Sequence, residues 1–113
     1  LTAEEVAQII IAYEPVWAIG TGEYADLDDV ERAVTKIRAE VTSLYGAVTG
    51  ASVSVLYGGS VTKENANAYL RIKGVDGLLV GGSSLSLATF WPIVECAEKL
   101  VDKKIVVTKK KGK

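Results

Sequence analysis

The sequence predicts an α/β fold in which three units, each a strand, a glycine-rich loop and a helix, follow one another. Three short apolar runs, "IIIAY", "SVSVLY" and "VDGLLV", each end near glycines. A helix-like stretch follows each run, so the pattern repeats at intervals of roughly thirty residues. Strands and helices that alternate in this way form parallel sheets with right-handed crossovers. We expect one domain over residues 1–113.

The first unit begins with a short helix, expected from Ala3 to Gln8, because Thr2 and Glu5 form a capping-box pattern. Ile9 to Tyr13 follows as a strand, and its nearly continuous apolar residues are typical of a parallel strand covered on both faces. After a glycine-rich stretch, Asp26 can cap a second helix that ends near Gly46. The apolar residues of that helix lie three or four apart: Val30, Val34, Ile37, Val41 and Leu44.

The second unit begins after a loop that we expect from Gly46 to Gly50. The strand Ser52 to Tyr57 alternates polar and apolar residues, as half-buried strands do. Gly58-Gly59 then forms a tight turn, and Lys63 to Arg71 is expected to be a helix.

The third unit has a strand from Val75 to Val80, which Gly81-Gly82 follows directly. Ser84 or Ser86 begins the last helix, which we expect to run to Val101. The three strand–loop–helix units are then complete.

Two features complicate the assignment of the C-terminal end. Pro92 has no backbone donor, so we place it in the first turn of the last helix or at a kink. The Lys-rich segment 102–113 is expected to be a solvated tail rather than a weak site for polyanions. Its end, "KIVVTKKKGK", has no clear assignment and is compatible with a frayed, strand-like end.

The composition excludes several classes of protein. With 49% hydrophobic and 24% charged residues, the chain lies in the globular range rather than the disordered or membrane range. Its apolar runs are too short to span a bilayer. The net charge of −1 argues against a general nucleic-acid surface. We therefore expect a cytoplasmic protein that binds neither membrane nor nucleic acid.

The residue types present also limit the chemistry. Cys96 is the only cysteine, and the sequence has no histidine and no methionine. An intrachain disulfide is therefore excluded, and we expect no metal site and no cofactor. Chemistry must come from carboxylates, hydroxyls, lysine, arginine or the backbone. We interpret Cys96, on the last helix, as a small buried hydrophobe.

Three glycine-containing loops, 14–22, 58–62 and 81–84, follow the predicted strands. Because the carboxyl ends of parallel strands lie on one rim, the loops should converge there. Glycine lets backbone N–H groups approach a ligand, and N–H groups at helix N-termini bind anions. A Gly-Gly pair can also serve only as a tight turn. Two pairs at equivalent strand ends favour a phosphate site.

Glu14 stands directly after the first predicted strand. A glutamate at a strand end is most often solvated or paired with a cation. Pro15, Val16 and Trp17 follow it here, and an apolar shell would desolvate the carboxylate, raise its pKa and make it a better base. From the residues alone, a solvated carboxylate and a catalytic base both remain open.

The motifs "AYEPVWAIGTG", "YGGSVTKENA" and "VDGLLVGGSSL" closely resemble the C-terminal segments of triosephosphate isomerases, in the same order and at suitable spacing. The resemblance covers residues 9–94. It implies the C-terminal part of a (βα)8 TIM barrel, with three parallel βα units. It also implies an isomerase that interconverts dihydroxyacetone phosphate and glyceraldehyde 3-phosphate in glycolysis and gluconeogenesis. The implied ligand is a small triose phosphate, and the full-length family forms homodimers.

The resemblance also implies roles for individual residues. Glu14 matches the base that moves a proton between two substrate carbons. The mobile lid matches the segment from Pro15 to Ala25, which includes Trp17. Ser60 matches a residue whose side chain binds the substrate phosphate. Gly20, Gly81 and Gly82 match residues whose backbone N–H groups bind it.

Further positions match the parts that close the lid. Tyr57 and Ser60 match residues that hold the closed lid. Ile19 and Leu79 match an apolar clamp that presses on the catalytic carboxylate and excludes water. The sequence departs from the family at Glu23-Tyr24-Ala25, where a Lys-Thr-Ala type of hinge is usual, and this puts the hinge kinetics in doubt.

The resemblance covers only part of an enzyme. The family's barrel has eight units and about 250 residues. Its electrophilic lysine and histidine, which follow the first and fourth strands, match nothing in this chain. We therefore expect the isolated chain to be inactive even with Glu14 in place. Three strands should also leave two edges and the inward face exposed, which favours self-association or partial unfolding.

Two other functions remain open from the sequence. One is a non-catalytic half-barrel that binds phosphate or self-associates. The other is a different phosphate-binding barrel enzyme, but only the triosephosphate isomerases account for Glu-Pro-Val-Trp together with both Gly-Gly turns.

Overall fold

A three-stranded parallel sheet forms the centre of the protein. The computed structural model describes residues 1–15 and 25–111. The strands are β1 (Ile10–Tyr13), β2 (Ser54–Gly59) and β3 (Gly77–Val80), in the order β1-β2-β3. The predicted parallel α/β arrangement is confirmed. The sheet pairs Tyr13 with Tyr57 and Gly59 with Val80.

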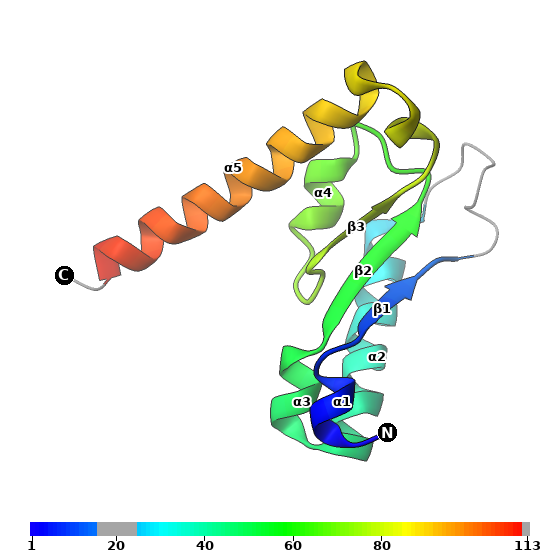
Figure 1. Ribbon diagram of the computed structural model, residues 1–113, viewed down its shortest axis with the longest axis vertical. Helices are drawn as coiled ribbons and strands as arrows, with labels where there is room; N and C mark the ends of the chain where they lie inside the picture. The colour runs from blue at the N-terminus through cyan, green and yellow to red at the C-terminus, as the bar shows by residue number, and fades with distance from the viewer. Residues whose placement is uncertain (16–24, 112–113) are drawn as a thin grey trace.

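The carboxyl ends of all three strands lie at one end of the sheet. Figure 1 shows the three arrows pointing the same way, with the segments after β2 and β3 beyond their tips. The helices α1 (Ala3–Val6) and α3 (Ala47–Ser52) lie at the opposite end. This arrangement places the loops that carry the candidate site residues together.

The first two helices begin where the sequence predicts. Thr2 caps α1 with a complete capping box, in which its amide and hydroxyl bind Glu5. Hydrogen bonds from the Thr2 backbone amide, and then its side chain, lower the pKa of the Glu5 carboxyl. Asp26 Oδ1 accepts a bond of 2.8 Å from Asp28 N at the start of α2 (Leu27–Tyr45). Both caps satisfy backbone donors that a helix start leaves unpaired.

The expected loop from Gly46 to Gly50 is wrong, because the chain forms α3 there. Gly46 has a φ of 99°, which ends α2 and lets α3 begin at once. Gly50 lets α3 lie close to α2, since a Cβ atom at this position would lie 1.9 Å from Thr42 Oγ1. The glycines that suggested a loop thus permit a tight corner between two helices.

The remaining helices are shorter or longer than expected. They are α4 (Ala66–Leu70), the 3-10 helix η2 (Gly82–Leu85) and α5 (Leu87–Lys111).

The C-terminal end differs from the prediction, in which the last helix ended at Val101. Pro92 lies inside α5, beyond its first turn. The backbone of the Lys-rich segment stays helical as far as Lys111 instead of becoming strand-like. Lysine is a good helix former, and no glycine interrupts the segment before Gly112. Cys96 is only partly buried, and its Sγ lies 3.7 Å from Asn67 Oδ1.

The hydrophobic core covers one face of the sheet. Val55 and Tyr57 on β2 are fully buried and face the helices, as two-residue alternation along a strand requires. The core also contains Val30 and Val34 from α2, Ala66 and Tyr69 from α4, and Ile93 from α5. Full burial of a valine-sized side chain contributes about 1.5–3 kcal/mol to the free energy of unfolding.

The other face of the sheet is open among the described residues. Ile10 is 65% exposed and Leu79 is 43% exposed. The expectation that β1 is covered on both faces is therefore wrong, because only Ile11 and Tyr13 pack against the core. Among the described residues, β1 and β3 each pair with β2 alone, as expected for a sheet that does not close into a barrel.

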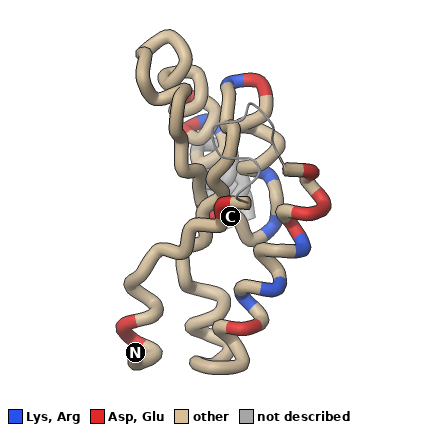
Figure 2. Tube along the Cα trace, turned by 90° about the vertical axis from the view of Figure 1, so that its right-hand side faces the viewer, with Lys and Arg blue, Asp and Glu red and all other residues tan. Residues whose placement is uncertain are grey.

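Arg38 on α2 ties the first unit to the other two. Its guanidinium donates to the carbonyl oxygens of Val53 (2.8 Å) and Gly74 (2.6 Å) and to Asp76 Oδ2 (2.7 Å). Asp76 Oδ2 also accepts a bond of 2.8 Å from Val55 N. Figure 2 shows charged residues of both signs along α2, and the three strands carry none.

Candidate functional site

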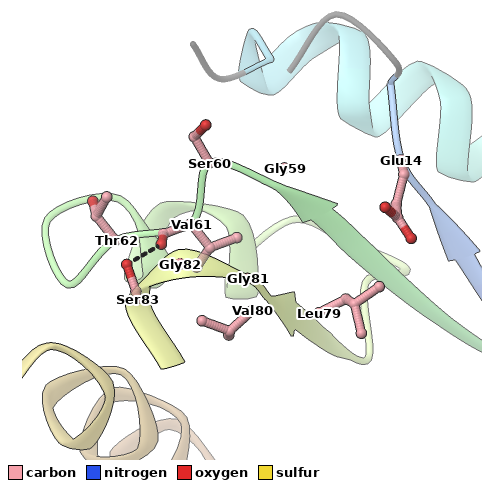
Figure 3. Close-up of a pocket in the computed structure, with 10 residues that line it drawn as sticks. All are labelled: Glu14, Gly59, Ser60, Val61, Thr62, Leu79, Val80, Gly81, Gly82 and Ser83. Atoms are coloured by element: carbon pink, nitrogen blue, oxygen red, sulfur yellow. Dashed lines mark hydrogen bonds between the residues drawn. The ribbon is translucent and has the colours of Figure 1, made fainter. Parts of the chain in front are cut away.

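A cavity of about 450 Å³ lies at the carboxyl ends of the three strands. Its size is within the usual range for small-molecule sites, about 300–1,000 Å³. Figure 3 shows the ten residues that line it: Glu14 after β1, the stretch from Gly59 at the end of β2 to Thr62, and the stretch from Leu79 near the end of β3 to Ser83. The expected convergence is therefore confirmed for the two loops after β2 and β3 and for Glu14, while residues 16–22 of the first loop lie outside the described residues. Gly58 and Gly59 belong to β2, so the tight turn expected there is wrong.

Glu14 extends from the tip of β1 over the end of β2. A Cβ atom at Gly58 would lie 2.8 Å from Glu14 Cγ and 3.3 Å from Leu79 Cβ. Because Gly58 has no side chain, Glu14 and Leu79 can both lie against it. The strand register explains why Glu14, Gly58 and Leu79 lie side by side. Gly58 pairs with Leu79, and the residues before Glu14 and Gly58, Tyr13 and Tyr57, pair with each other.

The carboxylate of Glu14 is exposed rather than enclosed. The expectation that a surrounding apolar shell desolvates it is thus wrong for this structure. Pro15 is buried but does not line the cavity, and Leu79 remains 43% exposed. Water therefore reaches the side chain that the sequence analysis singled out as a base.

The Gly81-Gly82 turn forms the opposite wall of the cavity. A Cβ atom at either glycine would have no neighbour within 4 Å, and neither glycine has a positive φ. Packing therefore does not explain why glycine occurs twice here. The open space leaves the backbone of this turn accessible to a ligand.

Ser60 lies on the wall formed by the loop after β2. Asn65 fixes this loop, because its Nδ2 donates to Ser60 O (2.9 Å) and its Oδ1 accepts from Thr62 N (2.8 Å). In Figure 3 the Ser60 side chain points away from the Gly81-Gly82 turn. The sequence analysis did not single out Asn65, although an asparagine three residues after a threonine is a common turn pattern.

Tyr57 lies beneath the cavity and binds the residue at which the described chain resumes. Its hydroxyl accepts a bond of 3.2 Å from Ala25 N, while the Tyr69 hydroxyl donates to Ala25 O. The two rings stack with centroids 4.2 Å apart, and both side chains are buried. The two tyrosine hydroxyls therefore bind both the backbone N–H and the backbone C=O of Ala25. The family resemblance pointed to Tyr57, but no motif in the sequence pointed to Tyr69.

Five residues that entered the sequence analysis of the lid lie outside the described residues. They are Trp17, Ile19, Gly20, Glu23 and Tyr24.

The cavity contains one side chain that can transfer a proton, and the Gly81-Gly82 turn exposes backbone atoms on the opposite wall. Of the described residues that line it, Glu14 alone has an ionisable side chain. Over the described part of the chain, there is no cluster of histidine, cysteine, aspartate or glutamate that could hold a metal ion. No helix within those residues is long and apolar enough to cross a membrane. The arrangement suits an anionic ligand at the turn and a carboxylate facing it.

Comparisons with known proteins agree with this geometry. The family model described as triosephosphate isomerase matches residues 1–97. The triosephosphate isomerase of Symbiobacterium thermophilum is 46% identical over 97 residues, which cover 86% of this chain and 38% of the relative. The triosephosphate isomerases of Streptococcus gordonii and Cutibacterium acnes are 45% and 48% identical over 95 and 94 residues. The chain thus spans 36–38% of the length of these curated relatives.

Proposed function

Because the chain belongs to the triosephosphate isomerase family, we propose that it supplies the base and the phosphate site of a triosephosphate isomerase. The proposed enzyme interconverts dihydroxyacetone phosphate and glyceraldehyde 3-phosphate in glycolysis and gluconeogenesis. The observation that carries this proposal is the single cavity that brings Glu14 to the Gly81-Gly82 turn.

In the proposed mechanism, Glu14 removes a proton from one substrate carbon and returns it to the neighbouring carbon. Backbone N–H groups of Gly81 and Gly82 bind the substrate phosphate, and the Ser60 hydroxyl joins them after its side chain rotates. Gly20 is the fourth proposed phosphate ligand. Triosephosphate isomerases are themselves a standard example of a glutamate base whose site a loop closes.

The segment from Pro15 to Ala25, including Trp17, is the proposed lid. The bonds from Ala25 to Tyr57 and Tyr69 support this role, because they fix the end of the segment. Closure would bring Ile19 and Leu79 against Glu14 and exclude the water that now reaches it. Exclusion of water would leave the carboxylate less solvated and so strengthen it as a base.

We further propose that the complete enzyme works in the cytoplasm as a homodimer on a free triose phosphate. It would need no metal or cofactor and no contact with a membrane or nucleic acid. The low net charge of this chain supports the proposal that it has no nucleic-acid surface.

The described cavity also favours a second function for the chain alone. A base without a cationic partner leaves the enediolate intermediate unstabilised, and each lost oxyanion donor costs about a hundredfold to a thousandfold in rate. Since Glu14 is the one ionisable residue among the described lining residues, the isolated chain would bind phosphate or self-associate without turnover.

We expect complementation to restore activity. The chain would be mixed with the part of the Symbiobacterium thermophilum relative that it does not match, and isomerisation followed in a coupled assay. The mixture should turn over glyceraldehyde 3-phosphate, while each part alone should be inactive. Phosphate binding without activity in a mixture that forms a stable complex would contradict the isomerase and favour the second function.

Gly82→Ala should weaken phosphate binding without unfolding the chain. The new methyl group would enter open space where the ligand approaches the backbone, and overpacking of a close contact costs about 1–3 kcal/mol. Titration of the chain with inorganic phosphate, monitored by NMR, should show an affinity about tenfold lower than that of the unsubstituted chain. Chloride at the same ionic strength is the control. An unchanged phosphate affinity would contradict the site.

A further inference from the structure

The two loops that form opposite walls of the cavity are joined by a side-chain hydrogen bond. Ser83 Oγ, on the loop after β3, donates to Val61 O, on the loop after β2, over 2.8 Å. Figure 3 draws this bond as a dashed line between the walls. Both residues line the cavity.

One end of this bond lies in the core, and the other is held by the first turn of α5. Val61 is 2% exposed, and its amide donates to Gly59 O over 2.9 Å. Ser83 O accepts a bond of 2.6 Å from Thr89 Oγ1 on α5. The Ser83 bond therefore links the core beneath β2 to the start of α5.

The loop after β2 is stiffened further by Asn65, which binds Ser60 O and Thr62 N on either side of Val61. Side chains thus hydrogen-bond to the backbone of three consecutive residues, 60–62: Asn65 binds the first and the last, and Ser83 binds the one between them. With the loop fixed internally, the Ser83 bond sets its distance from the Gly81-Gly82 turn.

We propose that Ser83 is a positioning residue that preorganises the anion site at Gly81 and Gly82 through its bond to Val61. This inference rests on the proposed function, because it assigns Ser83 to the phosphate site. The hydroxyl does not touch the ligand. It holds the glycine turn in the geometry that binds phosphate, so that less conformational freedom is lost on binding.

The first test is titration of the 113-residue chain with inorganic phosphate, with the amide signals of Gly81 and Gly82 as the NMR readout. Ser83→Ala should raise the Kd about three- to tenfold, the range expected for loss of one neutral hydrogen bond. Ser83→Thr keeps the Oγ donor and should restore the affinity. Ser52→Ala removes a hydroxyl at the other end of the sheet, where Oγ donates to Thr49 O, and should leave the Kd unchanged.

The second test is amide hydrogen exchange without ligand. Ser83→Ala should speed exchange at Val61 and Ser84 together, because both loops lose the same link, while Tyr57 in β2 stays protected. A raised Kd with joint loss of protection supports the inference. If the unsubstituted chain binds phosphate and Ser83→Ala leaves the Kd unchanged, the proposed role of Ser83 is overturned and the proposed function is not. No phosphate binding by the unsubstituted chain would overturn the proposed function, and the binding role of Ser83 with it.

Discussion

Glu14→Gln is expected to lower kcat of the complemented isomerase by about a hundredfold to ten-thousandfold, the usual contribution of a general base. Glutamine has nearly the same shape, so it can lie against Gly58 as Glu14 does, but it cannot accept the proton. The phosphate wall lies across the cavity and is untouched, so KM should change little. Steady-state kinetics with glyceraldehyde 3-phosphate would measure both parameters.

Glu64→Gln is the matched control for this experiment. Glu64 is an exposed glutamate just before α4, and it does not line the cavity. Its substitution should leave kcat within about twofold, as expected for a surface residue outside the site. A similar kcat in the Glu14→Gln and Glu64→Gln mixtures would contradict the assignment of Glu14 as the base.

Arg38→Met is expected to lower the free energy of unfolding by about 3 kcal/mol. The substitution removes the donors that bind Val53 O, Gly74 O and Asp76. Only 18% of the Arg38 side chain is exposed, so water replaces these donors poorly. Urea denaturation followed by circular dichroism would measure the change.

Arg32→Met provides the comparison. Arg32 pairs with Asp29 on the exposed side of α2, where its side chain is 74% exposed. Such surface pairs contribute about 0–1 kcal/mol, so the unfolding midpoint should barely move. Equal destabilisation by the two substitutions would show that Arg38 acts as an ordinary surface arginine and not as a link between the three units.

The sequence was sufficient to predict the three parallel strands and the end of the sheet at which the cavity lies. Apolar runs that end in glycines gave the strands, and the Thr2 and Asp26 patterns located the first two helix starts correctly. These signals are local, since caps and strand periodicity depend on neighbouring residues. The convergence of the loops followed from the rule that parallel strands share one carboxyl-end rim.

The errors arose where distant contacts decide the structure. Gly50 signalled a loop, but its closeness to Thr42 permits packing of α3 on α2. The exposure of Glu14 depends on which residues cover it, and neighbouring apolar residues in the sequence did not reveal that. Tyr69 and Ser83 act through partners 44 and 22 residues away, so no local pattern identified their roles.

The open space at Gly82 has a consequence for the evolution of the protein. The residue lies in the η2 helix, where alanine would fit and would restrict the unfolded chain. Gly82→Ala should therefore raise the free energy of unfolding by about 0.4–1 kcal/mol while it weakens phosphate binding. Selection for stability alone would replace this glycine, and selection for ligand binding would keep it. A thermostability screen of this chain that ignores phosphate would thus favour variants that lose the site.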